Sequence, residues 1–233
     1  MKRAGIIGGM SWESTLEYYK IMNQEVKRRL GKLHSADMLI YSFDFEDIEV
    51  MQHQDDWEGL AEAMVNSAKD LVAAGADFIV IATNTMHKLA PEIVMEVNVP
   101  LLHIADATAV EIKKRNFSKV ALLGTRFTME GKFYREKLEN EHNIEVIVPD
   151  LEDRKYIHSI IYNELCLGEI KEESRKKFEK IISKMKELGA QGVILGCTEI
   201  PLLIKEDSSP LPVFDTSTIH AKAAVNFALK EGK

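Results

Sequence analysis

The residue best suited to chemistry in this sequence is a cysteine that directly follows an apolar run. Residues 193–196 read Val-Ile-Leu-Gly, Cys197 comes next, and Thr198 and Glu199 follow it. Apolar runs of this kind are typical of parallel strands that are buried on both faces. Because ligands of open α/β sheets bind at the carboxyl ends of the strands, the sequence predicts that the Cys197 thiol lies in a binding site.

A second apolar run ends in the same way, with a hydroxyl in place of the thiol. Residues 78–82 read Phe-Ile-Val-Ile-Ala, and Thr83, Asn84 and Thr85 follow them. Thr83 therefore occupies the position that Cys197 occupies in the other run. We expect these two strand ends to form the two halves of one site.

The two runs belong to a longer internal repeat. Gly75 and Gly189 lie 114 positions apart, as do Thr83 and Cys197. Strands alternate with helices through both copies, a pattern typical of parallel sheets with helices on both faces. The sequence thus predicts an α/β fold with two pseudo-symmetric, doubly wound, parallel-sheet lobes and the site in the cleft between them. The first lobe comprises residues 1–103 and 217–233, and the second comprises residues 104–216.

Other elements of the first lobe are expected to position further groups around the Thr83 strand end. A glycine turn at residues 8–9 leads into a helix that ends at Gly31. Residues 38–43 form the next strand, and Gln52 lies in the loop after it. The first helix is predicted to present one apolar face, made of Leu16, Tyr19, Met22, Val26 and Leu30.

Composition restricts the partners of the protein. The 233 residues include 30 Lys and Arg against 37 Asp and Glu, for a formal net charge of −7. Nucleic-acid binding is not expected, because neutralising phosphates requires a basic surface. No apolar segment approaches the roughly 18 residues that span a bilayer, and the start lacks a signal-peptide core. Two cysteines make neither a disulfide framework nor a metal quartet, so we expect a reduced cytoplasmic protein with no metal and no membrane partner.

Four polar blocks follow predicted strands in order: Gly8-Gly9-Met10-Ser11-Trp12-Glu13-Ser14, Thr83-Asn84-Thr85-Met86-His87, Leu123-Gly124-Thr125-Arg126-Phe127-Thr128 and Gly196-Cys197-Thr198-Glu199. Together they resemble the conserved blocks of the aspartate/glutamate racemase family across essentially the whole chain. Within that family the sequence most resembles the bacterial L-aspartate/glutamate-specific racemases. The resemblance implies a racemase that needs no cofactor, pyridoxal phosphate included, and binds a small amino-acid substrate between its lobes. Many relatives are dimers, so a homodimer is expected.

The resemblance also implies a mechanism, and this sequence departs from it at one position. Racemisation needs an acid/base group on each face of the Cα atom, and thiols suit the task because their ordinary pKa is about 8.5. The family pattern has cysteine at both positions, whereas this chain has Thr83 opposite Cys197. In relatives the second cysteine takes the proton from the L isomer, so we expect attack on L-aspartate or L-glutamate by Cys197 and slow turnover of D isomers. A helix N-terminus after Cys197 is expected to lower the pKa of the thiol.

The same resemblance and the strand-end positions suggest which residues hold the substrate. Asn84, Thr85, Thr198 and Glu199 are candidates for binding the α-carboxylate and the ammonium group. Gln52 is the candidate for the distal carboxylate. We expect the cleft to be lined by Met10, Thr125 and Thr128.

Other interpretations of these residues remain open. The chain is alternatively a catalytically impaired relative that binds an amino acid, or a decarboxylase of the arylmalonate type, which needs only one cysteine. Cys166 lies on an apolar helical stretch and is expected to pack in the core or in a substrate loop. His87 and His103 flank the first strand end, where histidines are more often structural than catalytic.

Overall fold

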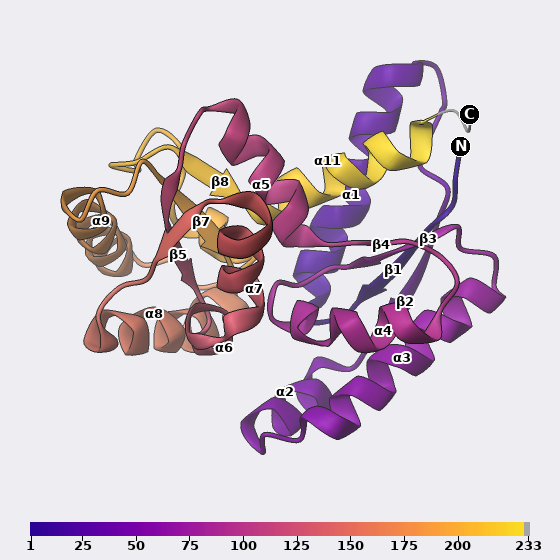
Figure 1. Ribbon diagram of the computed structural model, residues 1–233, viewed down its shortest axis with the longest axis horizontal. Helices are drawn as coiled ribbons and strands as arrows, with labels where there is room; N and C mark the ends of the chain where they lie inside the picture. Colours follow the sequence, from indigo (N-terminus) through magenta and orange to yellow (C-terminus); the bar gives the residue numbers. More distant parts are fainter. Residues whose placement is uncertain (231–233) are drawn as a thin grey trace. The chain divides into compact units, whose positions relative to one another are not determined.

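The computed structural model describes residues 1–230, and it contains two four-stranded parallel sheets flanked by helices (Figure 1). The strand orders are β2-β1-β3-β4 and β6-β5-β7-β8. The chain divides into two compact units: Met1–Ile104 with the residues from His220 on, and Ala105–Ile219. The predicted α/β class with two parallel sheets is therefore confirmed.

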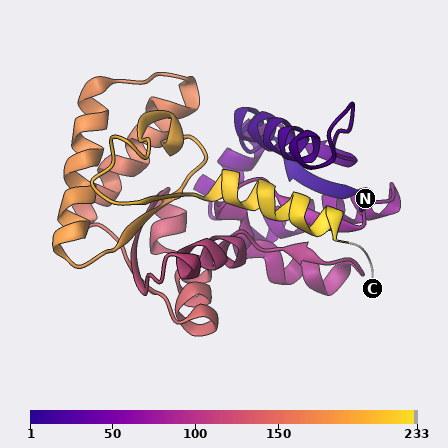
Figure 2. The same cartoon turned by 90° about the horizontal axis from the view of Figure 1, so that it is seen from above.

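The first unit contains β1 (Ala4–Gly8), α1 (Trp12–Leu30), β2 (Met38–Ser42), α2 (Phe45–His53), α3 (Trp57–Ala73), β3 (Phe78–Ile81), the 3-10 helix η1 (Thr85–Leu89), α4 (Ala90–Glu96) and β4 (Leu101–Leu102). Most of the C-terminal helix α11 (Thr216–Leu229) also belongs to it. Its alanine-rich face packs with α1 residues against β1 and β3, so α1 and α11 lie side by side on one face of the sheet (Figure 2).

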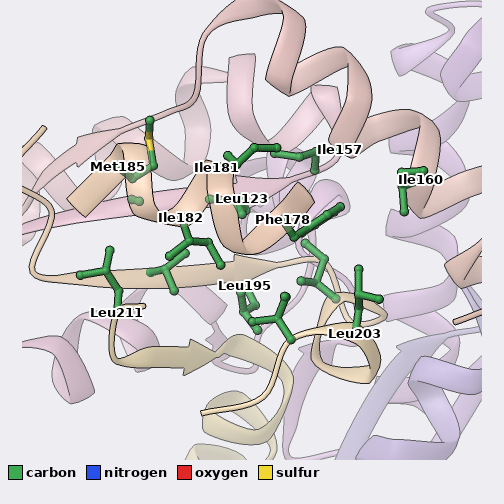
Figure 3. Packing of buried hydrophobic residues seen from close by; sticks show 14 of the residues in the cluster. Leu123, Ile157, Ile160, Phe178, Ile181, Ile182, Met185, Leu195, Leu203 and Leu211 are labelled. Atoms are coloured by element: carbon green, nitrogen blue, oxygen red, sulfur yellow. The ribbon is translucent and has the colours of Figure 1, made fainter. Parts of the chain in front are cut away.

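The second unit contains α5 (Ile104–Lys114), β5 (Lys119–Gly124), α6 (Arg126–Glu130), α7 (Lys132–Glu136), the π-helix η2 (Lys137–Glu141), β6 (Glu145–Ile147), α8 (Leu151–Asn163), the 3-10 helix η3 (Leu165–Leu167), α9 (Glu172–Glu187), β7 (Gly192–Gly196), α10 (Ile200–Leu203) and β8 (Val213–Asp215). Figure 3 shows Phe178 and Ile182 of α9 packed over Leu123 and Leu195 of the central strands. Half-buried Cys166 and Cys197 pack against this cluster, as expected for Cys166.

The repeat predicted from the sequence appears in the glycines that end two helices. Gly75 follows α3 with φ 98°, and Gly189 follows α9 with φ 91°. Only glycine adopts this left-handed conformation without steric cost. Each glycine comes before an inner strand, β3 or β7. The same type of helix ending therefore leads into the strand before Thr83 and into the strand before Cys197.

The predicted apolar face of α1 is correct at Met22 and Val26 but wrong at Leu16, Tyr19 and Leu30. Leu16, Tyr19 and Leu30 are 51%, 50% and 44% exposed, while Tyr18, Met22 and Val26 are buried. The first turn explains the rotation of the helix. Ser14 Oγ donates to the carbonyl of Ala82 at 3.0 Å, and Thr15 Oγ1 accepts from the Gly9 amide at 2.8 Å. These bonds turn the face of residues 14, 15, 18 and 22 toward the sheet.

The loop predicted after β2 is also wrong, because those residues form α2, which is capped by the Asp44 side chain. The predicted end of α1 at Gly31 is confirmed. No helix within residues 1–230 has both the length and the apolar character to cross a membrane.

An ion pair at the end of α1 makes stability depend on pH. Glu25 is 8% exposed and binds Arg28 and Arg29. The hydrogen bond from Arg28 is the largest cause that lowers the pKa of Glu25 from 4.5 to about 2. Because the folded-state pKa is depressed, the carboxylate stabilises the fold above pH 4.5, and this contribution disappears as the pH falls toward 2.

We expect Glu25→Gln to lower the free energy of unfolding at neutral pH by about 1 kcal/mol, since solvent screens the arginine side of the pair. Urea unfolding of both proteins over an acidic pH series measures the effect. The difference between them should shrink as the pH falls toward the depressed pKa of Glu25, and a constant difference would contradict the assignment. Glu17→Gln serves as a control, because Glu17 makes a pair with Lys20 that is exposed on both sides.

Candidate active site

Strand β7 carries Cys197 to the carboxyl end of the second sheet. All five residues of β7 are buried, and the strand lies between β5 and β8. Cys197 follows directly and is half-buried. A thiol at the end of an inner parallel strand stands where α/β proteins bind their ligands.

The surroundings of Cys197 disfavour the ionised thiol. Burial is the largest cause, and the negative charge of Glu199 adds to it, so the pKa of Cys197 is raised well above its ordinary value. The thiol also donates a hydrogen bond from Sγ to Glu199 Oε2, at 2.9 Å. The expectation that a helix N-terminus lowers this pKa is wrong, because α10 spans only four residues and the carboxylate opposes it.

Glu199 is placed to take the thiol proton. Its side chain is 5% exposed, and Oε2 accepts hydrogen bonds from Cys197 Sγ and, at 2.8 Å, from Thr198 Oγ1. A carboxylate within hydrogen-bond distance of a protonated nucleophile or base is a suitable proton acceptor. The sequence placed Glu199 among the substrate-binding candidates, whereas its observed contact is with the thiol.

Strand β3 carries Thr83 to the carboxyl end of the first sheet. The strand is fully buried between β1 and β4. Thr83 is half-buried, and the following Asn84 and Thr85 are only 2% and 6% exposed. His87 Nδ1 lies 2.7 Å from the carbonyl oxygen of Thr83. The threonine therefore sits on a segment whose backbone is held by a buried side chain.

The turn after β1 brings Met10 to the same end of the first sheet. Gly9 has φ 85°, and a Cβ atom there would collide with the backbone of Phe43. This close approach holds the turn against the end of β2. Met10 is 5% exposed and packs in the cluster that also contains Met86 of η1.

Gln52 reaches the same cluster from the last turn of α2. It is 4% exposed, and its Nε2 donates to the Sδ atom of Met86 at 3.1 Å. Its Oε1 is buried and has no hydrogen-bond partner. A buried polar atom without a partner is costly in free energy, so the Gln52 amide is a group that a bound ligand would satisfy.

Thr125 and Thr128 lie beside the Cys197 strand in the second unit. Thr125 caps α6, and Thr128 is fully buried. Gly124 pairs with Gly196 in the sheet register, and a Cβ atom on Gly196 would lie 3.3 Å from the Thr128 methyl group. Thr128 thus packs against the residue directly before Cys197.

The structure gathers the predicted residues into two groups, one in each unit. The first group contains Met10, Gln52, Thr83, Asn84 and Thr85, and the second contains Thr125, Thr128, Cys197, Thr198 and Glu199. Sequence reasoning missed the contact between His87 and Thr83. The signal in the sequence was that the two residues lie four positions apart, which is about one turn of a helix.

Among residues 1–230, one group of side chains has the spacing of metal ligands, namely Asp106, Glu141 and His142. Asp106 Oδ1 lies 2.7 Å from His142 Nε2 and 3.3 Å from Lys137 Nζ. A lysine ammonium competes directly with a cation for this carboxylate, so the group is an ion-pair cluster. None of the predicted site residues belongs to it.

Comparison with known proteins shows the family of the chain. Residues 7–224 match the family described as Asp/Glu/Hydantoin racemase. The structure is similar to that of a candidate Asp/Glu racemase from Yersinia pestis, with 53% identity, a TM-score of 0.93 and coverage of 99% of this chain and 100% of the other. An aspartate racemase homologue from Pyrococcus horikoshii OT3 is 40% identical over 99% of this chain and 100% of its own, with a TM-score of 0.86. The broad specificity amino-acid racemase RacX of Bacillus subtilis is 26% identical over 95% of this chain and 96% of its own.

The fold and these matches define the class of the protein, which is that of the amino-acid racemases. The chain belongs to the Asp/Glu/Hydantoin racemase family, whose pattern covers it from β1 to α11.

Proposed function

We propose that the protein racemises L-aspartate or L-glutamate without pyridoxal phosphate, by abstraction of the Cα proton with an asymmetric pair, Cys197 and Thr83. The observation that carries the proposal is the strand-end thiol of Cys197, hydrogen-bonded at 2.9 Å to the buried carboxylate of Glu199. The names of the relatives, which include aspartate and glutamate racemases, support these substrates.

The first step moves two protons. Glu199 takes the proton of the Cys197 thiol, and the thiolate then takes the Cα proton of the L substrate to become a thiol again. The electron pair left on Cα spreads into the α-carboxylate, where backbone N–H groups after the strand ends stabilise the added charge. Asn84, Thr85 and Thr198 are the proposed substrate-binding residues at these ends.

The second step returns a proton to the opposite face of Cα from the Thr83 side. A hydroxyl is a much weaker acid than a thiol, so Thr83 gives its proton to Cα and takes one from water at the same time, without holding a charge. The proton that Glu199 releases to solvent neutralises the hydroxide left by that water and restores the carboxylate. The return step is therefore slower than abstraction, and the enzyme favours L substrates over D substrates. Met10, Thr125 and Thr128 are proposed to line the space around the reacting carbon.

Gln52 is proposed to bind the distal carboxylate of the substrate. Its Nε2 now faces a thioether, which is a weak acceptor, and its Oε1 faces no donor. Rotation of the amide places the NH2 group where Oε1 now lies, and a carboxylate would accept from it.

We further propose a cytoplasmic homodimer. Helix α1 is the proposed contact surface for the second copy. Its residues Trp12, Leu16 and Tyr19 form an apolar stripe and are 63%, 51% and 50% exposed. The helix is acidic in its first turn and basic in its last, so two antiparallel copies place opposite charges together. Light scattering of the purified protein measures the mass.

The test of function is exchange of the Cα hydrogen with deuterated water, measured separately for L-aspartate, L-glutamate and their D isomers. We expect exchange from the L isomers and slower exchange from the D isomers. Thermal stabilisation by these amino acids without exchange would identify a binding protein instead. Release of carbon dioxide from an arylmalonate without amino-acid exchange would identify a decarboxylase.

Replacement of Glu199 by glutamine separates its two effects on the thiol. Removing the negative charge lowers the pKa of Cys197, because the carboxylate is one of the causes that raise it. Removing the proton acceptor slows exchange of L-aspartate by about 100-fold. The rate of exchange by the wild type should rise with pH as the thiolate forms. In Glu199→Gln the same rise should occur at lower pH.

The pH dependence of Cys197 alkylation by iodoacetamide reports the thiol directly. Both proteins carry Cys166→Ser in this experiment, so that the signal comes from one cysteine. A variant that alkylates at higher pH than the parent would contradict the role of Glu199.

A further inference from the structure

Three histidines gather below the Thr83 strand end, and the proposed reaction uses none of them. The His87 ring lies 4.6 Å from the His103 ring and 5.6 Å from the His220 ring, between centroids. His87 and His220 are fully buried. They come from η1, from the connection between β4 and α5, and from α11, so the cluster joins segments that are distant in the sequence.

The hydrogen bonds of His87 define which nitrogen carries its proton. The Ile104 amide donates to His87 Nε2 at 3.1 Å, so Nε2 carries no hydrogen. The proton of the neutral ring is then on Nδ1, which donates to the Thr83 carbonyl at 2.7 Å. A protonated ring has hydrogens on both nitrogens and would lose the bond from Ile104.

The neighbours of His87 keep it neutral. Burial is the largest cause, and His103 and His220 add to it, so the pKa of His87 is lowered well below its ordinary value. Tyr18 of α1 reaches the same cluster through its hydroxyl, 2.9 Å from His220 Nδ1. Backbone hydrogen bonds with Thr83 and Leu102 raise this pKa, but burial outweighs them. The ring therefore keeps its two bonds through the neutral pH range.

His220 also binds the connection between β4 and α5. Its Nε2 donates to the Leu102 carbonyl at 2.8 Å, and its Nδ1 accepts from Tyr18. Leu102 is the last residue of β4, and Ile104 is the first of α5. Two buried histidines thus hold the backbone of residues 102–104, and His87 also binds the Thr83 carbonyl.

We infer that His87 is a positioning residue for the return of the proton, holding the Thr83 carbonyl to the Ile104 amide so that the Thr83 hydroxyl keeps a fixed direction. The inference rests on the proposed function, because it needs Thr83 as the group on the return face. It goes beyond that function in assigning a role to a side chain that is covered by its neighbours. Abstraction by Cys197 does not depend on this link, whereas formation of the D isomer does.

The test compares three replacements in full-length protein. His87→Leu removes both hydrogen bonds. His87→Asn keeps a donor close to the position of Nδ1, and His87→Gln keeps an acceptor close to the position of Nε2. For each protein, two rates are measured from L-aspartate in deuterated water: deuterium incorporation into remaining L-aspartate, and formation of D-aspartate. Their ratio separates the return step from abstraction.

We expect His87→Leu to lower the ratio of D-isomer formation to L-isomer exchange by about 10- to 100-fold. Asparagine should restore most of the ratio, and glutamine should restore less, because the bond to Thr83 is the one that matters. A purely structural role would lower both rates together and leave the ratio unchanged, which would overturn the inference. An unchanged ratio with unchanged rates would overturn it as well.

Nitrogen NMR of wild-type protein labelled at histidine reports the tautomer of His87 without an activity measurement. The inference requires a neutral His87 with its hydrogen on Nδ1, and a hydrogen on Nε2 would refute it even in an active enzyme. Absence of any exchange in wild type would instead refute the proposed function, and the role in proton return with it. The two failures are thus distinguishable.

Discussion

Replacement of Cys197 by alanine is expected to abolish exchange of the Cα hydrogen of L-aspartate and L-glutamate, with a loss of at least about 1,000-fold. Alanine removes the only group of the second unit's strand end that is proposed to touch the Cα proton. The fold should survive, because the half-buried side chain lies at the edge of the core rather than inside it. Exchange into deuterated water, followed by proton NMR, measures the loss.

Cys166→Ala is the matched control for this variant. Cys166 is also half-buried and packs against the same core cluster, but it lies in η3 and not at a strand end. We expect this variant to keep exchange within a few-fold of wild type. Equal losses in both variants would show that packing, and not the thiol of Cys197, limits the reaction.

Replacement of Thr83 by cysteine is expected to have the second largest effect, in the direction of gain. A thiol is a far stronger acid than a hydroxyl, so it supplies a base on the face from which D isomers are attacked. We expect exchange from D-aspartate and D-glutamate to rise by about 100-fold, while exchange from the L isomers changes little. Initial rates from each pure isomer measure the change.

Thr83→Ser and Thr83→Val complete the comparison. Serine keeps the hydroxyl and should behave like wild type in its preference for L isomers. Valine keeps the shape and loses the hydroxyl, so it should form less D isomer while it still exchanges the L isomer. D-isomer formation by the valine variant at the wild-type rate would eliminate Thr83 from the mechanism.

The parallel sheets could be predicted because their strands are uninterrupted apolar runs between glycine-ended helices. The run before Cys197 and the run before Thr83 are inner strands, and the glycines at 75 and 189 end the helices that precede them. These features are local, so the sequence contains them directly. The family, and with it the class of enzyme, followed from short polar blocks at the strand ends.

The errors arose where tertiary contacts decide. The apolar residues of α1 predicted only part of the buried face, because two hydroxyl groups in its first turn bind strand-end backbone and set its rotation. The pKa of Cys197 was predicted in the wrong direction, since burial and Glu199 outweigh a short helix. The unpaired oxygen of Gln52 and the ring tautomer of His87 were also out of reach, because both are known only once the neighbours are placed.

The positions of the two tryptophans provide a built-in optical reporter. Trp12 begins α1 directly after the Met10 turn and is 63% exposed, whereas the Trp57 ring lies under the Lys88 ammonium at 3.3 Å from its centroid. Both belong to the unit that carries Thr83, and the sequence has no others. Tryptophan fluorescence therefore reports on that unit alone, and Trp57→Phe leaves Trp12 as the single tryptophan beside the turn, suited to following ligand entry in real time.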